Sequence, residues 1–130
     1  MTLDIPQHIS RRIEETLATV GADSFPMEVE AKGHGAIVLM GTIGLVCGLR
    51  PDGTMLEFDE DFGRPLSRLK KEDEIMALAA GVERYEWLAE LLPVRPPKAI
   101  DCPLCLGNGK LGPKNYILCS NCQCLGWVLP

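Results

Sequence analysis

The chain has 130 residues, of which 46% are hydrophobic and 24% charged, and its formal net charge is −5. This length suits one domain with a small appendage, and the composition is that of an ordinary soluble globular protein. The charge is uneven: residues 1–92 hold nine Lys/Arg and seventeen Asp/Glu, a net −8, whereas residues 93–130 hold four Lys/Arg and one Asp, a net +3. Neither part has the clustered basic face of a nucleic-acid-binding protein, so no nucleic-acid partner is expected.

Residues 5–20 are predicted to form an amphipathic helix. Apolar residues recur there at spacings of four, four, four and three, which is one face of a helix: Ile5, Ile9, Ile13, Leu17 and Val20. Pro6 suits a first helical turn, and Gly21 suits a helix end. The simplest interpretation is a helix that packs on the domain core, and a partner-binding helix is the alternative.

Residues 25–58 have the pattern of an antiparallel meander of three or four strands. Alternating or short apolar stretches are separated by turn residues, and the expected strands are 27–31, 36–40, 43–49 and 54–58. Pro51, Asp52 and Gly53 favour a tight turn before the last strand. His34 lies in a glycine-rich turn and His8 lies off the helix stripe, so neither is expected to bind a metal.

The uncharged stretch 36–49 raises the question of a membrane helix, because Gly44 and Gly48 have the spacing of a helix-dimer motif. Its 14 residues would span only about 21 Å as a helix, short of the ~30 Å hydrocarbon core of a bilayer. Glycines also divide the stretch into strand-sized pieces, so no membrane segment is expected. Cys47 within it is interpreted as a small buried hydrophobic residue.

Acidic residues gather at the end of the last expected strand: Glu57, Asp59, Glu60 and Asp61. Such carboxylates can act as acid and base or bind Mg²⁺ or Ca²⁺, but the EF-hand spacing is missing and no His or Lys accompanies them in register. A solvated turn is therefore a simpler interpretation than a catalytic or metal site. An acidic interaction patch is a further alternative.

Residues 70–92 are predicted to be helical, with Gly81 as a joint between two helices. The acidic residues 72–74 favour the start of a helix through its dipole. The proline-rich residues 93–99 cannot continue a helix and predict a short linker. The expected organisation is an α+β domain at 1–92, a linker at 93–99 and a cysteine-containing tail at 100–130.

The tail contains two Cys-x-x-Cys pairs, Cys102/Cys105 and Cys119/Cys122, with thirteen residues between them. A two-residue gap lets one turn direct both thiolates at one ion, and the second pair completes a tetrahedral shell, so these four cysteines are predicted to bind Zn²⁺. Four thiolates leave no coordination position for water or substrate, and the protein is therefore not expected to be an enzyme. The metal would fold the tail, which has few apolar residues of its own.

Glycines follow both pairs, as Cys-x-x-Cys-x-Gly-x-Gly in residues 102–109 and as Cys-x-x-Cys-x-Cys-x-Gly in residues 119–126. Glycine supplies the positive φ and the close backbone approach that a turn around a metal needs. The pattern resembles the cysteine-rich zinc domain of DnaJ-type co-chaperones over residues 100–128, with two repeats where that family has four. The resemblance implies that the four paired cysteines are zinc ligands and that the tail binds proteins in a chaperone-like or adaptor role. The chain has no His-Pro-Asp tripeptide, so the activity of a J domain is not implied.

Other functions stay open at this point. Cys102 and Cys105 can be the pair of a thiol–disulfide oxidoreductase, although such a pair usually lies at a helix N-terminus that lowers a thiol pKa, and zinc release under redox control is a variant. The α+β domain can instead be a small regulatory or immunity-type protein that binds a partner through its acidic surface. Cys124, at a glycine position, either buries as a small apolar residue or competes with Cys122 for the metal.

The six cysteines are not interpreted as a secreted disulfide scaffold. Residues 1–6 have neither the basic nor the apolar region of a signal peptide, so a cytoplasmic protein is expected. In a reducing compartment, paired cysteines bind metals more often than they form disulfides. Four thiolates and one Zn²⁺ add −2 to the +3 of residues 93–130, which leaves the tail near neutrality.

Overall fold

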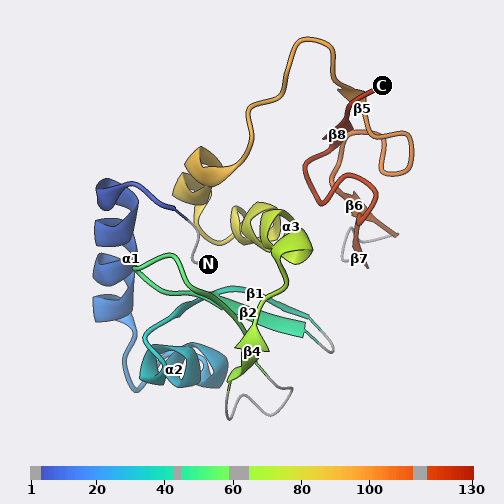
Figure 1. Ribbon diagram of the computed structural model, residues 1–130. Helices are drawn as coiled ribbons and strands as arrows, with labels where there is room; N and C mark the ends of the chain where they lie inside the picture. Colours follow the sequence, from blue (N-terminus) through green and yellow to red (C-terminus); the bar gives the residue numbers. More distant parts are fainter. Residues whose placement is uncertain (1–3, 43–44, 59–64, 113–116) are drawn as a thin grey trace. The chain divides into compact units, whose positions relative to one another are not determined.

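The computed structural model describes residues 4–42, 45–58, 65–112 and 117–130. The chain divides into two units, Met1–Lys70 and Lys71–Pro130 (Figure 1). The fold class is α+β as predicted, with helices, antiparallel sheets and a C-terminal group of four cysteines. Residues 93–99, the expected linker, contain no helix or strand and lie within the second unit, and the domain boundaries at residues 92 and 99 stay a prediction.

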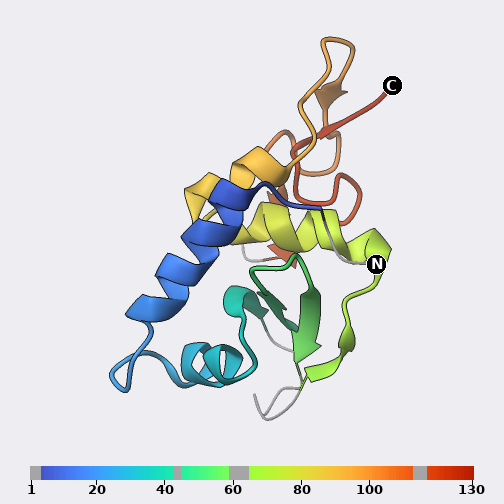
Figure 2. The same ribbon diagram turned by 60° about the vertical axis from the view of Figure 1, so that its left-hand side comes forward.

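The first unit combines two helices with a four-stranded antiparallel meander. Its strands follow one another across the sheet in sequence order. Helices α1 and α2 follow each other beside the sheet, and both contact its first strand (Figures 1 and 2). The elements are α1 (Gln7–Thr19), α2 (Pro26–Gly33), β1 (Ile37–Thr42), β2 (Leu45–Leu49), β3 (Met55–Phe58) and β4 (Pro65–Arg68).

The predicted first helix is confirmed. Ile9 and Ile13, in the middle of the apolar stripe, are buried, and the ends of the stripe are partly buried. Pro6 precedes the helix in an extended conformation instead of lying in its first turn. The helix ends at Thr19, where the next backbone N–H, that of Val20, turns back to the carbonyl of Leu17.

The strand predicted at residues 27–31 is wrong, because this segment is helix α2. Pro26 occupies the start of the helix, where its fixed φ is suitable and its missing N–H costs no hydrogen bond. Glu28 in the first turn and Lys32 in the last turn complement the helix dipole. Met27 and Ala31 lie four residues apart, which fits both an alternating strand and one face of a helix. Both pack on the apolar cluster of the sheet, so tertiary contacts and Pro26 favour the helix.

The sheet buries apolar residues on both faces. One face and α2 enclose a cluster of six buried residues: Ala31, Ala36, Val38, Val46, Leu56 and Phe58. Because side chains alternate along a strand, Cys47 and Leu49 lie on the other face, and both are fully buried. Cys47 is therefore a small buried residue, as predicted.

Gly48 has a packing role in the sheet. A Cβ built on Gly48 would lie 2.8 Å from Cε2 of Phe58 and 3.1 Å from Cβ of Ala36, so only glycine leaves room for the aromatic ring. Residues 37–42 and 45–49 form the antiparallel strands β1 and β2, which removes the membrane-helix alternative. None of the helices within the described ranges has the length and apolar character that crossing a bilayer demands.

Strand β4 was not predicted from the sequence, and the prediction for the acidic cluster stays untested. Strand β4 begins at Pro65 and pairs with β3 at the edge of the sheet, a position that tolerates proline because its outer side needs no N–H donor. Of the acidic cluster, Glu57 lies on β3, and Asp59, Glu60 and Asp61 lie outside the described residues.

The second unit begins with two helical segments, α3 (Lys71–Gly81) and the 3-10 helix η1 (Glu86–Leu91), which contact each other. Gly81 ends α3, so the predicted joint is confirmed. The buried residues of the pair are Ala77, Leu78, Ala80, Gly81 and Leu88. The rings of Tyr85 and Trp87 lie 5.5 Å apart between their centroids.

Candidate metal centre

The cysteine tail is built from two short loops held by two pairs of very short strands. Strand β5 (Ile100–Asp101) pairs with β8 (Trp127–Val128), and β6 (Lys110–Leu111) pairs with β7 (Ile117–Leu118), both antiparallel (Figure 1). Residues 102–109 form the first loop and residues 119–126 the second, called here knuckle 1 and knuckle 2. Each knuckle is therefore held at its ends by a strand from the other half of the tail.

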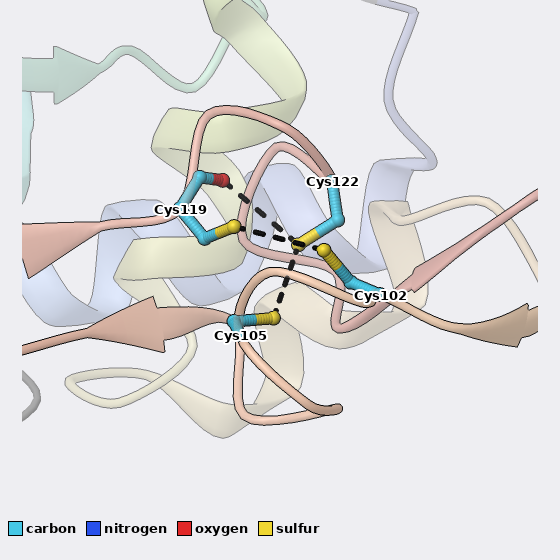
Figure 3. A group of neighbouring side chains, drawn as sticks. All are labelled: Cys102, Cys105, Cys119 and Cys122. Carbon is cyan, nitrogen blue, oxygen red and sulfur yellow. Dashed lines mark hydrogen bonds between the residues drawn. The ribbon is translucent and has the colours of Figure 1, made fainter.

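The four predicted ligands are brought together. The sulfur atoms of Cys102, Cys105, Cys119 and Cys122 all lie within 4.8 Å of one another, and all four residues are buried (Figure 3). The Sγ atoms of Cys102 and Cys119 are 3.8 Å apart, and those of Cys105 and Cys122 are 3.6 Å apart. Four sulfurs at the Zn–S distance of about 2.3 Å form a tetrahedron with edges of about 3.8 Å, so the spacing fits a tetrahedral ion. No disulfide involves any of the six cysteines.

A shift of 17 residues superimposes knuckle 1 on knuckle 2 in its hydrogen bonding. The N–H of Cys102 donates to the carbonyl of Gly126 at 2.9 Å, and the N–H of Cys119 donates to that of Gly109 at 3.1 Å. The strand pairs obey the same shift, since Ile100↔Val128 becomes Ile117↔Leu111. The tail thus has an approximate internal two-fold symmetry, with one Cys-x-x-Cys pair in each half.

Glycines keep the knuckles closed around the sulfurs. Gly109 and Gly126 have φ of 77° and 84°, and a Cβ on either would lie 2.6 Å from a carbonyl oxygen of the opposite knuckle, that of Cys124 or Gly107 respectively. Their N–H groups donate to sulfur: Gly109 to Cys105 Sγ at 3.1 Å, and Gly126 to Cys122 Sγ at 3.2 Å. The predicted role of these glycines, positive φ and close backbone approach, is confirmed.

Asn121 adds a donor that sequence reasoning missed. Its side-chain nitrogen lies 3.3 Å from Cys102 Sγ. This hydrogen bond is the main reason why the pKa of Cys102 falls to about 6, with help from the backbone of Cys105 and Leu104 and against the effect of burial. A polar residue inside the Cys-x-Asn-Cys turn is the one sequence signal that suggests such a donor, but it does not say which sulfur the side chain reaches.

Burial and the neighbouring thiols act in the opposite direction on Cys122. Desolvation, together with the hydrogen bonds to Cys105, Cys119 and Cys102, raises its pKa to about 12, although the N–H of Gly126 lowers it. Four thiolates so close together repel one another, and a cation removes this obstacle because a coordinated thiol loses its proton outright. The cluster is therefore a site whose fully ionised form needs a metal ion.

Cys124 lies outside the four-sulfur cluster. It stands at the position of Gly107 in the other knuckle and takes a φ of 62°, in the left-handed region that glycine normally fills. Burial raises the pKa of its thiol to about 11. Cys124 is partly buried, and Cys47 lies in the sheet of the other unit.

Few apolar residues accompany the cluster. Leu111 and Val128 pack against the cysteines, whereas Ile117 and Leu129 are exposed and Tyr116 lies outside the described residues. Two ion pairs lie beside the knuckles, Arg95–Asp101 at 3.0 Å and Lys110–Glu83, the second of which links β6 to the turn after α3.

The two knuckles differ in what they expose. Knuckle 1 carries Leu104 and Leu106, which are 60% and 77% exposed, where the 17-residue shift places Asn121 and Gln123 in knuckle 2. Leu106 also has a positive φ of 56°. Packing within the tail does not account for these two leucines, because most of their surface remains in contact with solvent.

No protein-family model, no curated protein and no solved structure matches this chain. Among the described residues, the four cysteines form the one group of metal-ligating side chains close enough to share an ion. The conclusions about function therefore depend on the geometry of this group.

Proposed function

We propose that the tail is a structural zinc module that serves protein–protein interaction and that the chain is not an enzyme. The observation that carries the metal centre is the set of four buried sulfurs within 4.8 Å of one another, with edges of 3.6 and 3.8 Å. Zinc is the best match because thiolates are soft ligands and a four-sulfur tetrahedral set is typical of structural zinc.

The structural role follows from the closed ligand set. Four thiolates satisfy a tetrahedral ion, so neither water nor substrate has a place on the metal. The N–H donors of Gly109 and Gly126 and the side chain of Asn121 spread the negative charge of the thiolates. When bound, zinc supplies four bonds that hold both knuckles, in a tail with little apolar packing of its own.

The interaction role is supported by the exposed leucines of knuckle 1. Leu104 and Leu106 flank the ligand Cys105, so the metal holds them on a rigid turn, and rigid exposed apolar side chains are typical of protein-binding surfaces. The DnaJ-type resemblance of residues 100–128 favours the same role. The near-neutral charge of the loaded tail is consistent with a protein partner.

A thiol–disulfide oxidoreductase is less well supported. Its Cys102 and Cys105 would need an accessible thiolate, and both sulfurs are buried in the four-thiol cluster with backbone and side-chain donors around them. A regulatory or immunity-type role for the acidic first unit remains compatible with a zinc module in the same chain.

Elemental analysis with a thiol count tests the metal centre directly. Protein purified without chelator should contain one zinc per chain, and four thiols should react only after a strong chelator is added. Replacement of zinc by Co²⁺ should give the absorption of a tetrahedral four-thiolate site. If the purified protein contains no metal and the thiols of the tail react before any chelator is added, the proposal is wrong.

The interaction role needs a separate test, because a zinc site can be purely structural. The variant Leu104→Asn/Leu106→Gln should keep its zinc, since it places at knuckle 1 the polar residue types found in knuckle 2. Proteins cross-linked to the zinc-loaded chain should be lost with this variant and kept with the control Leu129→Asn, which alters another exposed leucine of the tail. Identical cross-linked proteins for all three chains would contradict the role of knuckle 1.

A further inference from the structure

The four sulfurs of the metal centre fall into two pairs that the internal symmetry relates. Cys102 and Cys119 are both 0% exposed, and Cys105 and Cys122 are both 4% exposed. Each sulfur of the second pair accepts the backbone N–H of the glycine four residues further on, at 3.1 and 3.2 Å. Burial and these glycine donors therefore treat the two halves of the site alike.

A side-chain donor makes the two halves different. The amide nitrogen of Asn121 lies 3.3 Å from Cys102 Sγ. The 17-residue shift relates Cys102 to Cys119 and Asn121 to Leu104, whose side chain has no N–H to donate. Among the residues that the structure describes, no side-chain amide donates to the Cys119 sulfur. The amide of Asn121 thus distinguishes two ligands that are equally buried.

The backbone around positions 104 and 121 is closely similar in the two knuckles. Two residues further on, Leu106 and Gln123 have φ of 56° and 54°. The second cysteine of each pair accepts, at its carbonyl, the N–H of the residue three positions on, at 3.1 and 3.0 Å. A side chain at position 104 should therefore approach the opposite knuckle as that of Asn121 does.

Packing does not explain which residue stands at each position. Leu104 is 60% exposed, and Asn121 is also exposed, so water could satisfy its amide. The amide donates to a buried sulfur instead. A donor of this kind stabilises the charge of a metal-bound thiolate, and the loss of such an outer-shell partner typically changes metal affinity by about 10- to 100-fold. Leu104 has an apolar side chain in solvent at the place where an amide would serve the metal.

We propose that the two knuckles have different tasks at this position: Asn121 is a positioning residue that holds the ligand Cys102, whereas Leu104 leaves Cys119 without the equivalent donor and lowers the zinc affinity. This inference rests on the proposed zinc centre and makes its two halves unequal. It also implies that the exposed leucine, part of the surface proposed for partner binding, is present at a cost in metal affinity.

The experiment exchanges the two residues in the full-length chain. The variants are Asn121→Leu, Leu104→Asn and the double variant that carries both changes, and Ser120→Ala is a control for another exposed polar residue of the same turn. Zinc content is measured first, and zinc affinity is then measured by competition with a chelator of known affinity. Co²⁺ is also bound in place of zinc, and the sulfur-to-cobalt charge-transfer absorption is recorded. A hydrogen bond lowers the energy of the sulfur lone pairs, so its loss moves this absorption to longer wavelength, and a change that only loosens the turn does not.

Asn121→Leu should weaken zinc binding by about 10-fold or more and move the absorption to longer wavelength. Leu104→Asn should strengthen zinc binding by a similar factor and move the absorption to shorter wavelength. The double variant should resemble wild type in both measurements, and Ser120→Ala should change neither.

Two results would overturn the inference in different ways. If Leu104→Asn gains no affinity and the double variant keeps the defect of Asn121→Leu, Asn121 only supports its own turn, and the zinc centre stands without the proposed inequality. If wild-type protein contains no zinc, the proposed function is wrong, and this inference with it.

Discussion

The sheet of the first unit and the cysteine tail are held together in different ways. The sheet buries apolar side chains on both faces, among them Leu39, Leu49 and Phe58. Among the described residues of the tail, the buried side chains are the four clustered cysteines, with Leu111 and Val128 partly buried around them. The sheet is stabilised by removal of apolar surface from water. The tail depends instead on the interaction that holds its four thiols together, for which we propose a metal ion.

The magnitudes show how far apart these two modes are. Each fully buried aliphatic or aromatic side chain contributes about 1.5–3 kcal/mol, and the sheet shares its stability among many of them. A structural zinc site contributes about 10–16 kcal/mol through one ion. The sheet should therefore tolerate single substitutions that weaken it in part, whereas the tail should respond to ligand loss in an all-or-none manner.

The largest expected effect is loss of a ligand. Cys105→Ser should abolish zinc binding and unfold residues 100–130, because the zinc contribution of about 10 kcal/mol or more exceeds anything the few apolar contacts there can replace. Residues 1–70 should stay folded, since their core contains no cysteine of the cluster. Zinc content and amide hydrogen exchange along the chain measure both outcomes.

Cys124→Ser is the matched control for this variant, because it makes the same chemical change in the same tail outside the four-sulfur cluster. It should keep one zinc per chain and the protection of the tail. Unfolding of residues 1–70 in Cys105→Ser would show that the metal stabilises the whole chain and that the two regions are not independent.

A smaller effect, confined to the first unit, is expected from the core. Phe58→Ala removes a buried ring that lies in the six-residue cluster and over Gly48, and should cost about 3–5 kcal/mol of unfolding free energy. Phe25→Ala, in the same unit but at a side chain that is 71% exposed, should change it little. Urea denaturation measures both, and zinc content should stay constant. Zinc loss in Phe58→Ala would show that the stability of the first unit and metal binding in the tail are coupled.

The close approach of the knuckles should respond to a single methyl group. Gly109→Ala places Cβ 2.6 Å from the Cys124 carbonyl oxygen at a φ of 77°, a strain of about 1–3 kcal/mol. At about 1.4 kcal/mol per tenfold change, zinc affinity should fall by roughly tenfold or more, as measured by competition with a chelator of known affinity. Gly126→Ala should behave alike by the internal symmetry, and Gly21→Ala, which meets no atom within 4 Å, should have no effect on affinity. Different results at Gly109 and Gly126 would argue against the symmetry.

The features that the sequence predicted best are those with a strict local requirement. Cys102, Cys105, Cys119 and Cys122 come together as expected because thiolate spacing around an ion leaves few alternatives, and Gly109 and Gly126 follow from the same geometry. The first helix was predictable because its apolar stripe is long enough to distinguish a period of 3.6 from a period of 2.

Where an apolar pattern fits both the period of a helix and that of a strand, the sequence does not distinguish between the two structures. Residues 27–31 alternate like a strand, yet Met27 and Ala31 are also one helical turn apart, and their contacts with the sheet select the helix. Strand β4 carries no apolar alternation and forms through its pairing with β3. The Asn121 donor depends on how the two knuckles fold against each other, which spacing alone does not specify.

Cys47 provides the smallest effect and the sharpest check on the ligand assignment. It is a cysteine in the apolar region, fully buried on β2, so the comparison of the two regions predicts that its sulfur acts as a hydrophobic atom. Cys47→Ala should leave zinc content unchanged and reduce the unfolding free energy of the first unit by about 1 kcal/mol, the cost of removing one buried heavy atom of this size. Elemental analysis and urea denaturation of the same sample separate these readouts. A fall in bound zinc would mean that the metal recruits a thiol from the sheet, and the four-cysteine assignment in the tail would then be wrong.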